Sequence, residues 1–568
     1  MSENPRCKIQ NPKSADAKSF DPIQAEVWRH LLASIAEEMG ATLERAAYSP
    51  NIKDRLDHSC AVFDAEGRLL AQAAHIPVHL GAMPLMLDSL RASVDFPDGV
   101  MWLCNDPRHG GTHLPDLTLV APVYAEEREE GRDRREEKLT ADASLPSSLP
   151  NCSLPPLLGY VACRAHHADI GGISPGSLPL STSLFQEGLI LPPVKLIEND
   201  AVKEEIVNLV CANSRTPDER RGDLSAQIAA NRTGIRRLQE LVTQKGREEF
   251  ALRAEENIEW TAQAVRNTLK KLPPGTYAAT DVLDSDGAGQ TDIPITAQIT
   301  IRPEGTATFD FTGSAPQVAG SLNATEAITR SACYYIIRCL VEEEIATNAG
   351  CFAPIEVIAP LGTVVNARYP AAVAGGNVET SQRITDVLIR ALSLAAPEFM
   401  PAASQGTMNN LTIGGWDSVR GKPFAYYETM AGGAGASALG NGASAIHSHM
   451  TNTRNTPAES LESHYPLRLL RYAIADETGG AGAFQGGNGL IRAIELLSDA
   501  QISLLAERRL NAPFGAKGGE SGSTGKDSLQ TPGEAMKSIS GKFSANVAAG
   551  SVIQVQSPGG GGFNRLKN

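Results

Sequence analysis

Two short segments of the chain place imidazole and carboxylate side chains a few residues apart. Residues 110–116 read GGTHLPD, and residues 164–172 read RAHHADIGG. Histidine and aspartate are ligands of divalent-metal sites that activate water, and glycines beside them allow the tight turns that aim side chains inward. The chain holds 11 histidines, and three of them fall in these two segments. Both segments therefore predict a metal-dependent site.

A metal ion needs three or four protein ligands. His113 and Asp116 lie close enough in the sequence to serve one site, and a histidine and the aspartate of the second segment could complete it. A further carboxylate occurs in residues 51–58 (NIKDRLDH), beside a predicted strand. The candidate ligands are Asp57, His113, Asp116, His166, His167 and Asp169. The alternative is that these residues cap turns and pair with backbone groups, since a His-His pair is common in proteins that bind no metal.

Two other segments are dense in polar groups, residues 377–383 (NVETSQR) and 447–454 (HSHMTNTR). Such segments can line a substrate pocket by supplying directed hydrogen bonds. The candidate substrate-binding residues are Asn377, Thr380, Arg383, His447, His449 and Asn452. Helix capping and hydrogen bonding between domains are the alternative roles.

Two segments resemble a serine nucleophile elbow and an ATP-binding P-loop, but each lacks residues that its motif requires. Residues 172–176 (GISPG) match the nucleophile elbow, but Pro175 lacks the N–H that would stabilise an oxyanion, so a plain turn is expected. Residues 519–526 end in Gly-Lys without the first glycine of a P-loop, and Asp527 replaces its Ser or Thr. If the reaction uses ATP, another chain is expected to bind it.

The elements that must position these residues follow from hydrophobic periodicity. An amphipathic helix is predicted over residues 22–48, and residues 60–71 predict a hairpin around a turn. Residues 117–124 and 159–163 predict short buried strands beside the two metal-binding segments. Residues 126–156 start with a dense charge run and predict a solvated loop, with a partner-binding arm as the alternative.

After residue 223 the predicted secondary structure changes from helix to strands and back to helix. Residues 223–272 predict helix, and strict alternation in residues 293–301 and 307–311 predicts a hairpin. Helices are expected again over residues 325–341 and 380–396. From about residue 475 the chain is rich in glycine, with short strands.

These elements predict a multidomain α/β (α+β) protein. The expected parts are a flexible N-terminus (1–20), an N-terminal α/β metal-binding catalytic region (21–272) containing the inserted loop 126–156, an α/β region with the hairpin and pocket motifs (273–474), and a Gly-rich β-type region (475–568). A length of 568 residues requires more than one core.

Bulk properties narrow the functional classes. The formal net charge of −14 argues against a nucleic-acid partner. No apolar run is long enough to span a bilayer, and residues 1–20 lack the apolar core of a secretion signal. We therefore expect a cytoplasmic protein without a membrane or nucleic-acid partner.

Several ordered motifs together resemble the hydantoinase B/5-oxoprolinase family. They are residues 51–57 (NIKDRLD), 75–81 (HIPVHLG), 111–116 (GTHLPD), 166–172 (HHADIGG), 375–378 (GGNV), 447–454 (HSHMTNTR) and 557–563 (SPGGGGF). The resemblance covers nearly the whole chain from about residue 20. Departures are Asp54 in place of the usual Glu, His58 in place of Phe, the Arg108-His109 pair, and the insertion at 126–156.

The resemblance implies a hydantoinase B-type fold and one half of a divided reaction. A hydantoinase A-type partner with an actin-like ATPase fold would bind Mg-ATP and phosphorylate the amide oxygen of a small cyclic amide. The present chain would hydrolyse the activated ring within a hetero-oligomer. Carried onto this sequence, the resemblance implies that Asp57, His113, Asp116 and His166 hold a divalent metal, zinc or manganese. It also implies that His167 or Asp169 orients the ligands or moves a proton.

The substrate is suggested by residues 408–412 (MNNLT) and 426–435 (YYETMAGGAG), which look most like the 5-oxoprolinase branch. The expected reaction converts 5-oxo-L-proline, ATP and water to L-glutamate, ADP and phosphate. Hydrolysis of hydantoin, N-methylhydantoin or another lactam is an alternative. Two further alternatives are that the chain is an acetone-carboxylase-like subunit, or that it is a non-catalytic scaffold for an ATPase partner.

Overall fold

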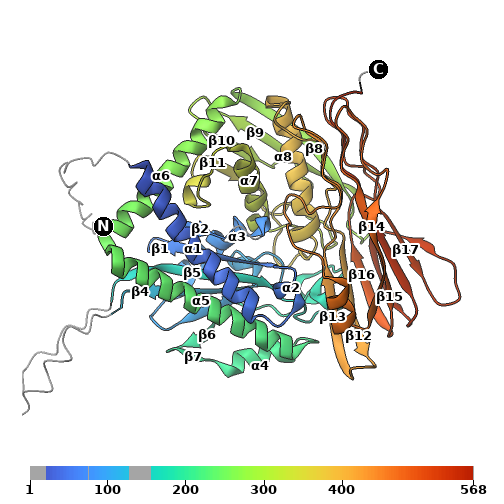
Figure 1. Ribbon diagram of the computed structural model, residues 1–568, viewed down its shortest axis with the longest axis horizontal. Helices are drawn as coiled ribbons and strands as arrows, with labels where there is room; N and C mark the ends of the chain where they lie inside the picture. The colour runs from blue at the N-terminus through green and yellow to red at the C-terminus, as the bar shows by residue number, and fades with distance from the viewer. Residues whose placement is uncertain (1–20, 74–75, 127–154, 567–568) are drawn as a thin grey trace, which may run out of the picture.

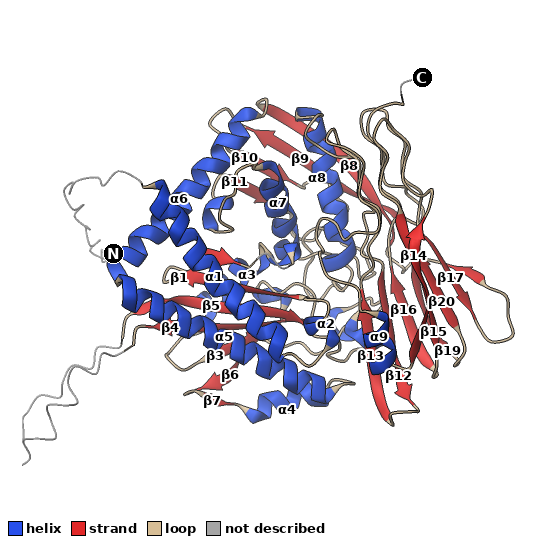
Figure 2. Ribbon diagram, in the orientation of Figure 1, coloured by secondary structure: helices blue, strands red, loops and turns tan. Residues whose placement is uncertain are grey.

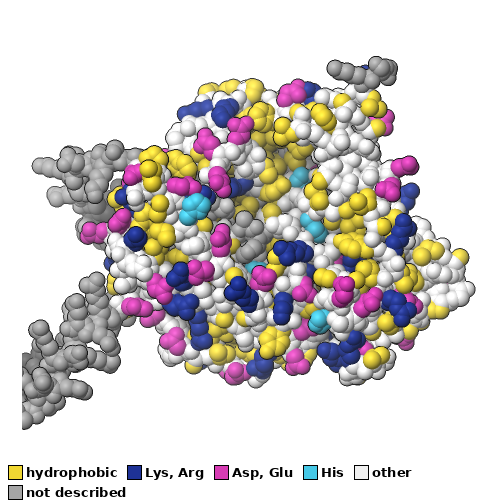
Figure 3. Space-filling model, in the orientation of Figure 1, with side chains coloured by type: hydrophobic (Ala, Val, Ile, Leu, Met, Phe, Trp, Pro, Cys, Tyr) yellow, Lys and Arg dark blue, Asp and Glu magenta, His cyan; other side chains and the backbone are white. Residues whose placement is uncertain are grey.

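The computed structural model describes residues 21–73, 76–126 and 155–566. Helices and several sheets alternate along the chain, which confirms the expected mixed α/β class (Figure 2). Residues 1–20 and nearly all of the predicted loop at 126–156 lie outside the described residues. Side chains of both charges are spread over the face shown in Figure 3, with hydrophobic side chains between them.

The N-terminal part is built on a seven-stranded sheet. In spatial order its strands are β2 (Leu69–Gln72), β1 (His58–Asp64), β5 (Leu157–His166), β4 (Asp116–Tyr124), β3 (Met101–Cys104), β6 (Val194–Glu198) and β7 (Ala201–Val202). The predicted hairpin at 60–71 is confirmed as β1 and β2, and the two predicted buried strands as β4 and β5. Because β4 and β5 are antiparallel neighbours, Asp116 lies opposite His166.

Helices cover one face of this sheet (Figure 1). Helix α1 (Pro22–Ala46) begins at Asp21, whose carboxylate accepts hydrogen bonds from the N–H groups of Ile23 and Gln24. Helices α5 (Pro217–Lys245) and α6 (Arg247–Lys271) confirm the predicted helical stretch at 223–272. They are separated at Gly246, whose φ of +89° is a conformation that favours glycine. Shorter helices are α2 (Pro50–Lys53), α4 (Glu204–Ala212) and α3 (Ala82–Ser93), and α3 packs into the core on the opposite face of the sheet.

The middle part packs on the other face of the sheet. Its four strands lie in the order β11 (Ile355–Ile358), β10 (Ala307–Asp310), β9 (Thr291–Ile301) and β8 (Gly275–Ser285), and β9 with β10 confirms the predicted hairpin. Helices α7 (Glu326–Leu340) and α8 (Ser381–Ala395) lie where helices were predicted. A single π-helical turn, Gly376–Thr380, leads into α8.

Alternation along β1 explains how the sheet joins two cores. Ala61 and Phe63 belong to the core shared with the middle region, which also contains Phe309. Cys60 and Val62 belong to the core shared with Trp28 of α1. Successive strand residues point to opposite faces, so the sheet is a buried layer between the helices and the middle region.

Two antiparallel sheets complete the fold (Figure 1). One has the order β13 (Lys422–Glu428), β12 (Asn410–Asp417), β16 (Ala500–Leu505) and β19 (Lys542–Val547). The other has the order β14 (Leu467–Ala475), β15 (Gly489–Leu496), β20 (Val552–Gln556), β17 (Lys526–Gln530) and β18 (Lys537–Ile539). Helix α9 (Ala458–His464) precedes β14. Both sheets combine strands from before and after the boundary expected at residue 475.

One buried arginine joins the N-terminal part to these sheets. Arg55 is only 1% exposed, and its Nη1 donates to Asn51 Oδ1 and to the carbonyl oxygen of Tyr427, each at 2.6 Å. Its Nη2 donates to Thr429 Oγ1 at 2.9 Å. Because Tyr427 and Thr429 are distant in the sequence, Arg55 fixes residues 51–57 against β13 and the residue that follows it.

Replacing Arg55 with methionine is expected to lower the free energy of unfolding by about 2–4 kcal/mol, because several buried acceptors lose their donor. Arg55→Lys should recover little, since lysine cannot reproduce the planar fork of donors. Arg236 on α5 is a matched control because its side chain is 64% exposed. Thermal unfolding followed by circular dichroism should separate Arg55→Met from Arg236→Met, and equal melting temperatures would contradict the role of Arg55.

Candidate metal centre

The pairing of β4 with β5 gathers three potential metal ligands. Asp116 is the first residue of β4, His166 is the last of β5, and His113 lies in the turn before β4. His113 Nε2 lies 3.0 Å from Asp116 Oδ1 and 3.0 Å from His166 Nδ1. His166 Nδ1 lies 3.2 Å from Asp116 Oδ1. Among the described residues, these three form the cluster whose possible ligand atoms all lie within 4.8 Å of one another.

The spacing of the three atoms fits one shared cation. Bonds of about 2.1 Å at angles between about 90° and 109° place neighbouring ligand atoms about 3.0–3.4 Å apart. The three observed separations, 3.0, 3.0 and 3.2 Å, lie within this range. Two imidazoles and one carboxylate are also a ligand set of hydrolytic zinc and related sites. The residues present therefore fit a divalent metal.

Backbone contacts set the orientation of His113. Its Nδ1 lies 3.3 Å from the carbonyl oxygen of Ala374, so an Nδ1–H donates there and Nε2 presents its lone pair to the cluster. Glu187 in turn fixes this backbone, because its Oε1 accepts hydrogen bonds from the N–H groups of Val373 (2.9 Å) and Ala374 (3.0 Å). Burial raises the pKa of Glu187 to about 7.

Asp116 has further contacts through its second carboxylate oxygen. Its Oδ2 accepts a hydrogen bond from Thr112 Oγ1 at 2.6 Å and lies 3.4 Å from His79 Nε2. Burial acts to raise the pKa of Asp116, but the histidines, His113 foremost, outweigh it and hold that pKa well below its usual value. Burial also opposes the charged form of His113, yet Asp116 outweighs it and raises the pKa of His113.

A narrow pocket opens onto the cluster. The space that the centre of a water-sized molecule can occupy is about 20 Å³, enough for one ion or one water molecule. Asp57 and His79 line it together with Asn377, whose Nδ2 lies 2.9 Å from His113 Nε2. The ring of Tyr427 stacks on His166 with a centroid distance of 4.7 Å. Further polar lining comes from Thr429, Thr451 and Thr453.

Asp57 thus lies at the pocket, beside the three-residue cluster. It is buried, and burial raises the pKa of its carboxyl, while His166 acts in the opposite direction. Its backbone oxygen accepts a hydrogen bond from the N–H of His166 at 3.0 Å. The structure therefore brings together four of the six candidate ligands.

His167 and Asp169 point elsewhere. His167 follows the last strand residue, and its Nε2 contacts Gln227 Oε1 of α5 at 3.0 Å. Burial lowers the pKa of His167 to about 4. Asp169 pairs with Arg215 at 2.9 Å and accepts a hydrogen bond from the N–H of the same residue. Because neighbours along a strand face opposite sides, the His-His pair offers one ring to each face.

The candidate substrate residues divide between the pocket and its surroundings. Asn377 lines the pocket, whereas Thr380 Oγ1 donates to the carbonyl oxygen of Leu322. His447 and His449 lie in the loop that supplies the pocket threonines, and burial lowers the pKa of His447 to about 3. Asn452 of that loop is exposed.

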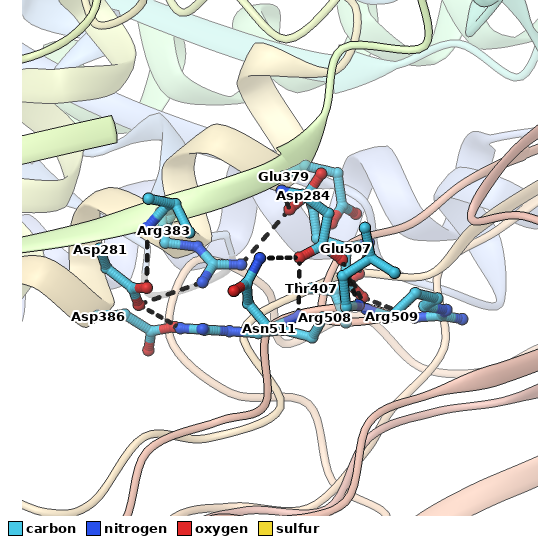
Figure 4. Close-up of polar contacts among 12 residues, drawn as sticks. Asp281, Asp284, Glu379, Arg383, Asp386, Thr407, Glu507, Arg508, Arg509 and Asn511 are labelled. Atoms are coloured by element: carbon cyan, nitrogen blue, oxygen red, sulfur yellow. Dashed lines mark hydrogen bonds and ion pairs between the residues drawn. The ribbon is translucent and has the colours of Figure 1, made fainter. Parts of the chain in front are cut away.

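Arg383 belongs to a buried network of acids and arginines (Figure 4). It lies 3.1 Å from Asp281 and 3.5 Å from Glu507, while Arg508 bridges Asp281 and Asp386 at 2.6 Å each. This network joins β8, α8 and the loop after β16. Glu379 connects it toward the pocket, since Asn410 donates to Glu379 and accepts a hydrogen bond from Tyr427.

Sequence reasoning missed four residues that hold the cluster: His79, Thr112, Glu187 and Tyr427. Thr112 and His79 lie inside motifs noted for other reasons, so their positions were visible but their roles were not. Glu187 has no local signal, because its partners Val373 and Ala374 are far away in the sequence.

No described helix combines the length and apolar character needed to cross a bilayer.

Several known proteins are similar to this chain in sequence or in structure. The chain is 38% identical to 5-oxoprolinase 1 of Arabidopsis thaliana over 96% of its own length, but it covers only 42% of that protein. The ATP-dependent caprolactamase from Pseudomonas jessenii has a similar structure, with a TM-score of 0.84, 26% identity, and coverage of 96% of this chain and 92% of that one. Acetone carboxylase has the same TM-score at 19% identity, covering 97% of this chain and 77% of that one, which shows a shared fold.

The family pattern described as Hydantoinase B/oxoprolinase matches residues 21–565. This confirms the resemblance drawn from the ordered motifs. The chain therefore belongs to the hydantoinase B/oxoprolinase family.

Proposed function

We propose that this chain is the hydrolytic half of an ATP-dependent cyclic amidase, and that 5-oxo-L-proline is its substrate. The observation that carries the proposal is the cluster of His113, Asp116 and His166 in a pocket of a chain from this family. Identity to a plant protein named 5-oxoprolinase 1 supports the choice of ring. The cluster would hold a divalent metal, whose contribution would be to lower the pKa of water and so provide a nucleophile near neutral pH.

Other residues of the chain are assigned to metal binding and substrate binding. His113, Asp116 and His166 would hold the metal, and Asp57, which lines the same pocket, would supply a fourth ligand. Asn377 and the pocket threonines offer hydrogen bonds to the polar atoms of a small ring.

His79 is better placed than His167 or Asp169 to accept a proton. It lines the pocket, and burial lowers its pKa, which outweighs the opposite effect of Asp116. Asp169 and His167 instead stabilise the surrounding fold through Arg215 and Gln227.

The ATP-using half is proposed to lie outside this chain. The sequence has no convincing nucleotide-binding motif, and the chain covers only 42% of the plant relative. It covers 92% of a caprolactamase chain whose enzyme is ATP-dependent. These observations support a hydantoinase A-type ATPase partner that binds Mg-ATP.

Mixing the chain with that partner, Mg-ATP and 5-oxo-L-proline should release equal amounts of L-glutamate and ADP. His113→Ala should abolish glutamate release and weaken metal binding by about 100-fold or more, because it removes a ligand. Metal content is measured by elemental analysis of the purified chain. His30→Ala is the matched control, since His30 lies on α1 with its side chain 65% exposed.

Unchanged metal content and activity in His113→Ala would refute the metal centre. If the mixture hydrolyses hydantoin or caprolactam but not 5-oxo-L-proline, the proposed substrate is wrong, whereas the proposed reaction class stands. ATP hydrolysis by the partner with no ring opening on any of these amides would favour the scaffold role.

Glu187→Ala should weaken metal binding by about 10-fold or more, because the Val373–Ala374 backbone that orients His113 loses its acceptor. Glu187→Gln should retain most of the affinity, since its amide oxygen can still accept both N–H hydrogen bonds. Titration of the metal-free chain with zinc or manganese measures the difference. Equal affinities in the alanine variant and the parent chain would show that Glu187 does not position His113.

The same residue gives a pH dependence of stability. Because the folded pKa of about 7 lies above the ordinary value of 4.5, the stability contributed by Glu187 is complete at low pH and declines as pH rises toward 7. Glu187→Gln is always neutral, so its stability relative to the parent should rise between about pH 5 and about pH 8 by about 3 kcal/mol. Melting temperatures of the metal-free proteins across this range provide the measurement, and a constant difference would contradict it.

A further inference from the structure

Three sequence motifs meet beside the pocket at the metal cluster. They are residues 51–57, 426–435 and 447–454. The first supplies Arg55 and the second Thr429, while the third supplies Thr451 and Thr453. The outer two are joined through their backbones, because the N–H of Arg454 donates to the carbonyl oxygen of Arg55 at 3.1 Å. All three threonines line the pocket, and each is at most 5% exposed.

Arg55 carries a buried positive charge without an acid as its direct partner. Its four hydrogen bonds go to Asn51 Oδ1, to Thr429 Oγ1, and to the carbonyl oxygens of Tyr427 and Arg454. All four acceptors are neutral, and no described carboxylate forms an ion pair with Arg55. A buried charge without a counter-charge is costly. An anion bound nearby would therefore stabilise this part of the molecule.

The threonines form a chain of hydroxyl groups that starts at Arg55. Arg55 Nη2 donates to Thr429 Oγ1 at 2.9 Å, and this oxygen lies 2.8 Å from Thr453 Oγ1. Thr453 Oγ1 lies 3.4 Å from Thr451 Oγ1. A guanidinium group can only donate, so it polarises the Thr429 hydroxyl to donate onward to Thr453. The hydroxyl protons of the chain therefore point from Arg55 toward Thr451.

One hydroxyl proton of this chain has no acceptor. Three O–H groups share two contacts with one another, and the described residues offer them no other acceptor. With the direction set by Arg55, the remaining proton belongs to Thr451, which is 3% exposed and lines the pocket. A buried donor without an acceptor is costly. An acceptor atom in the pocket would therefore complete the chain.

The charges around the pocket favour a single anionic group. Asp57 and Asp116 together offset the two charges of a divalent cation held as proposed above. Arg55 then leaves one positive charge, and Thr451 leaves one O–H donor. A carboxylate meets both requirements, because it carries one negative charge and accepts hydrogen bonds. A lactam without a carboxylate has no charge to offer Arg55.

Apolar side chains complete the lining of the pocket. Met408 and Met450 belong to it, and both are buried. A five-membered ring needs more than the present free space of about 20 Å³, and unbranched methionine side chains change conformation readily. The pocket therefore combines a polar, charged end with walls that can adapt to a small ring.

We propose that Thr451 and Arg55 select cyclic amides that carry a carboxylate. Thr451 donates its O–H to a carboxylate oxygen of the ring and determines specificity. Arg55 is a positioning residue, because it acts through Thr429 and Thr453, and its charge compensates that of the carboxylate. The inference rests on the proposed function, and it assigns the residues that distinguish 5-oxo-L-proline from lactams without a carboxylate.

The kinetic test compares 5-oxo-L-proline with 2-pyrrolidinone, the same five-membered lactam without the carboxylate. The complex with the ATPase partner and Mg-ATP should prefer 5-oxo-L-proline, measured as the ratio of kcat/KM for ring opening. Thr451→Val nearly keeps the side-chain volume but removes the O–H, so this preference should fall by about tenfold or more. Thr451→Ser keeps the O–H and should retain most of the preference.

Binding of ring-opened products gives a second readout that needs neither ATP nor the partner. L-glutamate retains the ring carboxylate, whereas 4-aminobutyrate lacks it. In calorimetric titrations of the metal-loaded chain, the parent should bind L-glutamate more tightly than 4-aminobutyrate. Thr451→Val should weaken L-glutamate binding by about tenfold or more. Its metal content should equal that of the parent, which separates lost recognition from a lost metal centre.

Thr308→Val is the matched control. Thr308 Oγ1 also accepts a hydrogen bond from an arginine, Arg302, at 2.8 Å, but Thr308 lies on β10 and does not line the pocket. This variant should keep both the parental preference for 5-oxo-L-proline and the parental affinity for L-glutamate.

Equal losses with both lactams in Thr451→Val would assign its O–H to an oxygen that both rings share, and would overturn carboxylate selection. Parental values of the preference and of the L-glutamate affinity in that variant would overturn it as well, as would a parent chain that binds both products equally. If the parent complex opens neither ring, the proposed function fails. The L-glutamate titration still decides the present inference in that case.

Discussion

Burial of one carboxylate, that of Asp116, governs the architecture around the candidate centre. A carboxylate removed from water is costly unless charges and donors surround it. Thr112, His79, His113 and His166 meet this requirement around Asp116, which is 1% exposed. They come from the turn before β4, the 3₁₀-helix Pro77–His79 and the end of β5. The positions of these elements therefore follow from the need to surround one charge.

Each imidazole of the cluster is in turn supported by a distant part of the chain. Glu187 fixes the backbone that orients His113, and Tyr427 stacks on His166 while Arg55 holds the Tyr427 carbonyl. Such outer contacts fix the direction of a ligand and the lone pair that it presents. A metal site of this kind depends on packing over the whole molecule as much as on its ligands.

Local patterns predicted much of the fold. Helix α1, the β1–β2 hairpin and the β9–β10 hairpin follow from periodicity and turn residues alone. Local sequence also predicted part of the candidate metal centre, because His113 and Asp116 lie only three residues apart. Pairing of β4 with β5 could not be predicted from spacing, so the choice between His166 and His167 had no basis in the residues alone. Strand alternation in the structure turns His166 toward Asp116 and His167 toward Gln227. The role of Glu187 could not be predicted because its contacts with the backbone that orients His113 are distant in the sequence, as with Val373 at a separation of 186 residues.

The interleaved C-terminal sheets have a consequence for the order in which the protein can mature during synthesis. Every candidate metal ligand lies before residue 170, so a ribosome exposes all of them early. Tyr427, which closes one wall of the pocket, lies on β13 and pairs with β12, and β12 needs β16 as its second neighbour. β16 in turn pairs with β19 near the end of the chain. A nascent chain therefore carries all the candidate ligands long before it can enclose them, and any metal loading before release would occur at an open, solvated site.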